Sequence, residues 1–77
     1  MALGYVLICA EAGKEVDIGN KLLKIREVAE VHRLSEQYDF IVKVNTDSTD
    51  QLAQVIVNEV KTLEGIIKTN VLFAIKF

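Results

Sequence analysis

The segment YDFIVKVN, residues 38–45, is the clearest predicted strand because its side chains alternate between apolar and mixed positions. One face would carry Tyr38, Phe40, Val42 and Val44, and the other Asp39, Ile41, Lys43 and Asn45. An apolar face opposite a mixed one, repeating every two residues, predicts a β-strand that is buried on one side. The segments before and after this strand determine what covers that side.

Three elements are predicted before this strand, separated by changes in hydrophobic periodicity. The first is an apolar run, LGYVLICA, the second has its apolar residues on one helical stripe, and the third has polar residues interspersed. They are a strand over residues 3–10, a helix over residues 14 to about 26 and a strand over residues 28–34, and a turn over residues 35–37 follows them. Because the first strand is apolar on both faces, both of its sides should be covered.

A second helix and a last strand are predicted after the central strand. Ser48 and Gln51 have the spacing of a helix-capping box, and Gly65 stands where a helix commonly ends in a left-handed residue. The apolar stripe between them consists of Leu52, Val55, Ile56, Val60 and Leu63. Residues 66–77 then finish the chain as a strand that is again apolar on both faces.

The predicted order, βαββαβ, is that of an α+β ferredoxin-like domain with a four-stranded antiparallel sheet and two helices on one face. No proline-rich, low-complexity or linker-like segment divides the chain, so residues 1–77 are predicted to form a single domain. The other sheet face has no helix to cover it. An apolar patch of roughly several hundred Å² is the size at which a partner is expected, so we expect two subunits to pack sheet against sheet.

Composition supports an oligomer and argues against several other classes. A domain of 77 residues is marginal alone, and its single cysteine excludes an internal disulfide. With Cys9 and His32 as the only soft ligands, we expect no metal site. The net charge of -2 lacks the basic excess that direct nucleic-acid binding needs, and no apolar run is long enough for a membrane span or a signal peptide. We therefore expect a cytoplasmic protein.

Residues that could carry catalysis are few. Cys9 lies in an apolar strand, where a thiol is inert, and His32 has Glu30 as a same-face neighbour but no nucleophile or second acid nearby in the sequence. Four single glycines make no phosphate-binding loop. We expect no catalytic residue and no cofactor, so the chain is predicted not to be an enzyme. A small dimeric ferredoxin-like enzyme that uses His32 remains the alternative.

The segment SEQYDF, residues 35–40, is the most informative for function. A hairpin turn entering a strand would explain it, but Tyr38 and Asp39 also place a phenol and a carboxylate together at a turn. A carboxylate can accept hydrogen bonds from an ammonium group, and a phenol offers a hydrogen bond and an apolar wall. This combination suits an amino-acid ligand.

Taken together, these segments resemble the C-terminal effector (RAM) domain of the Lrp/AsnC, or feast/famine, transcription regulators. The resemblance covers nearly the whole chain and rests on five segments in order and spacing. They are GYVLI at residues 4–8, GKE at 13–15, VAEVH at 28–32, YDFIVKV at 38–44 and LEGI at 63–66 followed by Lys68-Thr69. Because the chain begins at the first strand, without the family's helix-turn-helix, it resembles the stand-alone form of this domain.

The resemblance implies a non-enzymatic module that senses a small effector and oligomerises. It implies dimers formed through the sheet faces, assemblies of those dimers, and an amino acid or related metabolite bound between dimers. The implied ligand-binding residues are Tyr38, Asp39, Glu36, Gln37 and Thr69. Co-assembly with full-length Lrp/AsnC-type regulators would then be the route to modulating transcription.

Two positions depart from the family pattern. Glu36 stands where the family usually has a glycine two residues before the Tyr-Asp pair, and Val71 stands where a second threonine is common. Glu36 would lie at the implied pocket, where it could change the ligand preference or fill the space. A purely structural oligomer without a ligand is therefore a third interpretation.

Overall fold

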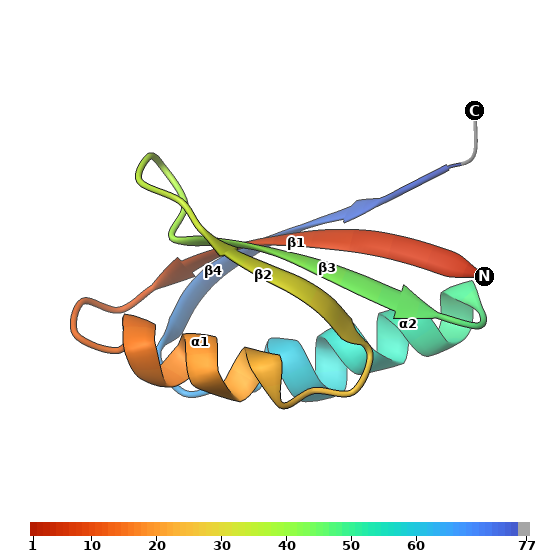
Figure 1. The fold of residues 1–77 in the computed structure, drawn as a ribbon, viewed down its shortest axis with the longest axis horizontal. Helices are drawn as coiled ribbons and strands as arrows, with labels where there is room; N and C mark the ends of the chain where they lie inside the picture. Colours follow the sequence, from red (N-terminus) through yellow and green to blue (C-terminus); the bar gives the residue numbers. More distant parts are fainter. Residues whose placement is uncertain (76–77) are drawn as a thin grey trace.

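The computed structural model describes residues 1–75 and shows four strands and two helical segments in the order βαββαβ (Figure 1). The strands are β1 (Ala2–Ala10), β2 (Val28–Arg33), β3 (Phe40–Thr46) and β4 (Ile66–Phe73). The helices are α1 (Glu15–Leu23) and α2 (Thr49–Val55), and α2 continues into a π-helical segment, η1 (Ile56–Val60). The predicted α+β ferredoxin-like fold is confirmed.

The sheet has the order β2-β3-β1-β4, and every neighbouring pair is antiparallel. β1 and β3 are therefore central, and β2 and β4 are the edges. Both helices lie against the same face of the sheet, below it in Figure 1, so the molecule has two layers. The opposite face, which we call the open face, has no helix over it.

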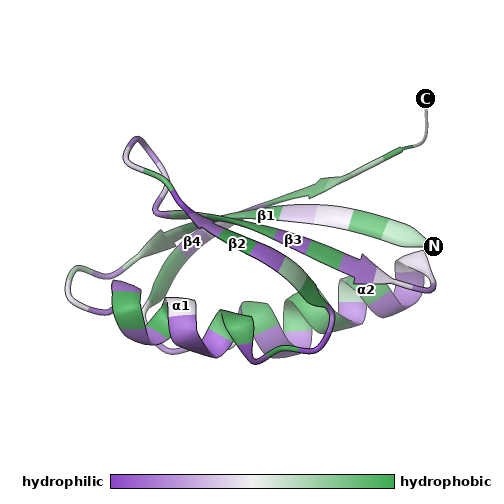
Figure 2. Cartoon of the chain, viewed as in Figure 1, coloured by the Kyte–Doolittle hydropathy of each residue, from purple (hydrophilic) through white to green (hydrophobic). Residues whose placement is uncertain are grey.

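The core fills the space between the sheet and the helices. In β3, Phe40, Val42 and Val44 are buried, as the alternation predicted. The other core side chains are Val6 and Ile8 from β1, Ile18 and Leu22 from α1, and Leu52, Val55, Ile56 and Val60 from the second helix. The helices in Figure 2 alternate between hydrophobic and hydrophilic bands because only one side of each faces this core.

The ends of several elements differ from their prediction. The first helix stops at Leu23, about three residues early, and the N–H groups of Lys24 and Ile25 close its last turn. The central strand begins at Phe40, two residues late. The last strand ends at Phe73, and the final two residues of the predicted strand lie outside the described residues. Strand and helix ends depend on local hydrogen bonds that hydrophobic periodicity does not encode.

The second helix begins as the capping-box spacing predicted. The Ser48 hydroxyl accepts a hydrogen bond from the Gln51 N–H at 3.1 Å, and the Gln51 side chain accepts one from the Asp47 N–H at 3.3 Å. Its last turn is wider than an α-helix, because the Lys61 N–H donates to the Ile56 carbonyl five residues earlier. The sequence stripe predicted the buried face of this helix but not the wider turn.

The open face mixes apolar and polar side chains. The register places Leu7 of β1 between Ile41 of β3 and Asn70 of β4, and Tyr5 between Lys43 and Leu72. Leu72 is about half exposed in the single chain. The apolar centre of this face is thus bordered by polar groups, which is the composition of an interface core with a polar rim.

Gly65 and Gly13 allow the packing contribution of a turn glycine to be measured. Both have positive φ, 96° and 89°. A Cβ on Gly65 would lie 2.9 Å from the Lys14 Cβ, whereas a Cβ on Gly13 meets nothing within 4 Å. We expect Gly13→Ala to destabilise the fold by about 1–2 kcal/mol through backbone strain alone, and Gly65→Ala by more. Urea unfolding of both variants would measure the difference, and equal losses would contradict the predicted clash.

Candidate functional site

The turn between β2 and β3 is tied to the end of β1 by backbone hydrogen bonds. The Leu34 N–H donates to the Asp39 carbonyl at 2.9 Å and closes the turn. The Asp39 N–H donates to the Ile8 carbonyl at 2.8 Å, which joins the turn to the centre of the sheet. The short segment that carries Tyr38 and Asp39 therefore has a defined position relative to β1.

The Asp39 carboxylate makes a third bond in this region. Its Oδ2 atom accepts a hydrogen bond from the Ala10 N–H at 2.6 Å. This contact lies where the β1–β4 pairing shifts register, between Cys9 and Ala10. Asp39 therefore holds the end of β1, and its Oδ1 atom accepts no hydrogen bond from another residue among residues 1–75.

Tyr38 lies beside a cation from the neighbouring edge strand. The Lys68 Nζ atom is 5.9 Å from the centre of the Tyr38 ring, within the range of a cation–π contact. Lys68 is opposite Cys9 in the β1–β4 register, and the Cys9 thiol donates to the Gln37 carbonyl at 3.5 Å. The turn, the end of β1 and the start of β4 thus meet at one corner of the sheet.

The five predicted ligand residues take different positions at this corner. Tyr38 and Asp39 are half-buried, while Glu36 and Gln37 lie exposed on the turn. Thr69 is half-buried on β4, opposite Ile8, and points to the other side of the strand from Lys68. Lys68 was not predicted for the site. The only signal for it was its place next to Thr69, since its proximity to Tyr38 depends on strand register.

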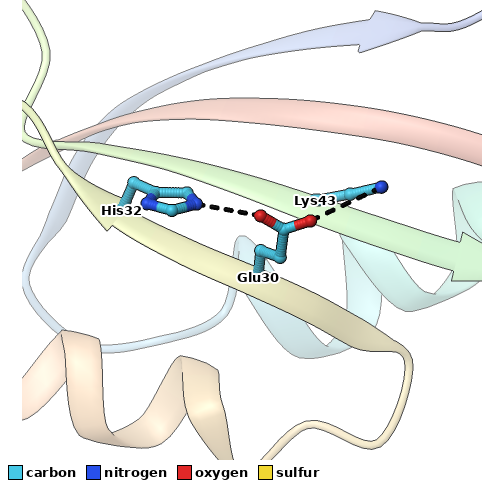
Figure 3. A network of polar contacts seen from close by, with 3 residues as sticks. All are labelled: Glu30, His32 and Lys43. Carbon is cyan, nitrogen blue, oxygen red and sulfur yellow. Dashed lines mark hydrogen bonds and ion pairs between the residues drawn. The ribbon is translucent and has the colours of Figure 1, made fainter.

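A separate polar cluster lies on the open face (Figure 3). His32 Nε2 and Glu30 Oε1 are 3.0 Å apart, and Lys43 Nζ is 3.5 Å from Glu30 Oε2. These hydrogen bonds, the one from His32 first, hold the pKa of the Glu30 carboxyl below its usual range. Tyr5 and Ile41 complete a hollow of about 250 Å³ around this cluster, which is distinct from the Tyr38–Asp39 corner.

Comparisons with known proteins identify the family. The model of the Lrp/AsnC ligand binding domain matches residues 5–77. The chain belongs to the Lrp/AsnC ligand-binding domain family. Among solved structures, a hypothetical protein of Pyrococcus horikoshii is 35% identical, with a TM-score of 0.92 over 100% of this chain and 93% of that one. Escherichia coli AsnC is 25% identical, with a TM-score of 0.90 over 99% of this chain and 52% of that one.

The Lrp/AsnC relatives with curated descriptions are longer than this chain. The HTH-type transcriptional regulator FL11 of Pyrococcus furiosus is 31% identical over 74 residues, which are 96% of this chain and 48% of the regulator. The chain therefore spans about half the length of the curated regulator that it matches. Within residues 1–75, none of the helices combines the length and apolar character that crossing a bilayer requires.

The contact between Asp39 and Ala10 predicts that replacing Asp39 lowers the stability of the fold. Asp39→Ala leaves the Ala10 N–H without its carboxylate, so we expect a loss of about 1–2 kcal/mol in the free energy of unfolding. Asp39→Asn keeps an acceptor oxygen and should lose less. Urea unfolding measures both, and an unchanged stability in Asp39→Ala would contradict the role of this bond.

The Glu30 cluster predicts a small dependence of stability on pH. Because the folded pKa of Glu30 is lowered, its contribution is fully present above the ordinary pKa of about 4.5 and is lost as the pH falls through the lower folded value. Glu30→Gln should therefore lose slightly more stability at pH 6 than at pH 3. Urea midpoints across this range test it, with the exposed Glu11→Gln as control. Parallel curves for the wild type and Glu30→Gln would rule the contribution out.

Proposed function

We propose that this chain is a non-enzymatic ligand-sensing and oligomerisation module that binds an amino acid or a related small metabolite. The observation that carries the proposal is the corner formed by Tyr38, Asp39 and Lys68, in a domain of the Lrp/AsnC ligand-binding family. The corner combines an acidic group, a basic group and an aromatic wall. These are the groups that an α-amino acid requires at its ammonium, carboxylate and side chain.

Each group at this corner has a distinct role in the proposal. Asp39 uses one carboxylate oxygen for the Ala10 N–H, and its Oδ1 atom is left to accept a hydrogen bond from the ligand ammonium. Lys68 faces the ligand carboxylate, and the Tyr38 ring holds the lysine in position. Glu36 and Gln37 border the site from the turn, whereas Thr69, which points to the other side of β4 from Lys68, supports the strand from behind the site. A subunit from a second dimer would close the pocket over this corner.

The open face is the proposed dimer contact. Its apolar centre at Leu7 and Ile41 continues to Leu72 on the edge strand, and residues 1–75 provide no helix to cover it. A domain of this size gains stability by burying that surface against a second copy. Assemblies of such dimers, and co-assembly with full-length Lrp/AsnC-type regulators, would connect ligand binding to transcription. Nucleic acid and membrane have no part in this proposal.

Thermal unfolding against a panel of amino acids tests ligand binding. A ligand at 100 times its Kd stabilises the folded state by about 2.7 kcal/mol, which shifts the Tm of a small domain by on the order of 10 °C. We expect one or two amino acids to do so, and Asp39→Asn to lose the shift because it removes the charge while keeping an acceptor for Ala10. The exposed Asp47→Asn is the matched control. A flat panel with an unchanged oligomer would favour a purely structural assembly.

Sedimentation equilibrium tests the dimer contact. Leu7→Glu places a charge at the centre of the open face, where burial without a partner charge is costly, so the mass should fall to that of one chain. Val57→Glu is the control, because Val57 is an equally apolar residue exposed on the helical layer. Dimers that persist in Leu7→Glu but dissociate in Val57→Glu would place the contact on the helices instead.

A further inference from the structure

A second hollow lies on the helical side of the molecule, between α1 and the edge strand β2. Its volume is about 240 Å³, and it contains none of the residues of the Tyr38–Asp39 corner. This is somewhat smaller than the range of about 300–1,000 Å³ found for drug-sized ligands, so a small metabolite would fit it better. We call it the α1/β2 groove.

The floor of the α1/β2 groove is open because α1 has a glycine there. Glycine inside a helix is unfavourable relative to alanine. A Cβ at Gly19 would lie 3.4 Å from the Phe40 ring, which is an ordinary van der Waals distance. The packing of α1 against Phe40 would therefore accept an alanine at this position. The missing side chain instead leaves room beside Phe40, and Gly19 and Phe40 both line the groove.

One end of the groove carries a positive and a negative group. Since α1 is joined to β2 by a short loop, the two elements run in opposite directions, and the start of α1 lies near the end of β2 (Figure 1). Glu15 and Arg33 therefore line the same end. The Arg33 guanidinium is 5.2 Å from the Phe40 ring centre, and it forms no ion pair within residues 1–75.

Glu15 is held in place by its own loop. Its Oε1 atom accepts a hydrogen bond from the Gly13 N–H at 2.8 Å, and it forms no ion pair with another described residue. A guanidinium can bind a carboxylate through two parallel hydrogen bonds, and a carboxylate accepts hydrogen bonds from an ammonium. The two side chains thus match the two charges of one zwitterion.

The rest of the groove is apolar and exposed. Val16 and Leu23 on α1 are 72% and 65% exposed, although both line a hollow that also contains the half-buried Val31. Leu23 is eight residues after Glu15, about 12 Å along the helix, so the apolar surface extends away from the charged end. The groove is lined by α1, which lies on the opposite side of the sheet from the open face, so a sheet-to-sheet dimer would leave the groove accessible.

We propose that the α1/β2 groove is a second binding site in each subunit and that it takes an aliphatic α-amino acid. Arg33 binds the carboxylate, Glu15 binds the ammonium, and the side chain lies along Gly19 and Val31 toward Leu23. This site is independent of the Tyr38–Asp39 corner, so either site can exist without the other.

Amide NMR of the ¹⁵N-labelled chain, titrated with L-leucine to about 20 mM, tests the site residue by residue, given an expected Kd of about 1 mM. We expect the amides of Gly19, Asn20 and Val31 to shift in a saturable manner.

Arg33→Gln should weaken the affinity at least about tenfold, whereas Arg26→Gln, an exposed arginine outside the groove, should not. Gly19→Ala should stabilise the helix yet weaken binding. 4-Methylpentanoate and 3-methylbutylamine, which lack one charged group each, should both bind more weakly than leucine.

Other outcomes would overturn the proposal in recognisable ways. Shifts confined to Tyr38 and Asp39 would retain the proposed function and exclude the groove. Groove shifts that Arg33→Gln leaves unchanged would show apolar adsorption only. Groove amides that shift on diluting the protein without leucine would mean that a second copy of the chain occupies the groove. No shift anywhere would exclude leucine at the groove, while the panel of amino acids would still decide the corner site.

Discussion

The structure depends on one constraint: both helices of this short chain cover the same face of its four-stranded sheet. The βαββαβ order imposes this, because both crossover connections pass on one side. All of the largest buried side chains are therefore on the helical side of the strands. The apolar residues on the other side, with Leu7 at their centre, remain for a partner.

The contact between Asp39 and Ala10 connects this architecture to the proposed ligand site. It holds the turn before β3 against the end of β1, at the point where the β1–β4 pairing is irregular. The same carboxylate is proposed to bind the ligand ammonium through its other oxygen. A ligand at this corner would thus contact the residue that aligns three strands. Ligand binding would then affect the shape of the sheet, and through it the assembly. Asp39→Ala would remove both the hydrogen bond to Ala10 and the charge proposed to bind the ligand ammonium, whereas Asp39→Asn removes only the charge.

The hydrophobic pattern was sufficient to predict the strands, the helices and their order. Alternation in residues 40–44 predicted the buried face of β3, and the capping residues predicted the start of α2. The pattern could not predict the π-helical turn at residues 56–60 or the early end of α1, because these depend on individual backbone hydrogen bonds. The site was predicted in part. Tyr38 and Asp39 are adjacent in sequence, but Lys68 approaches Tyr38 only through the β1–β4 register.

The proposed dimer requires the open face to pack against a second copy of the chain. Isotope-filtered NOE spectroscopy on a mixture of labelled and unlabelled chains tests it most directly, since it detects only contacts between subunits. If two open faces pack together, we expect intermolecular NOEs among the methyl groups of Leu7, Ile41 and Leu72. Intermolecular NOEs that arise instead from α1 and α2, or a dimer with none from the open face, would contradict it.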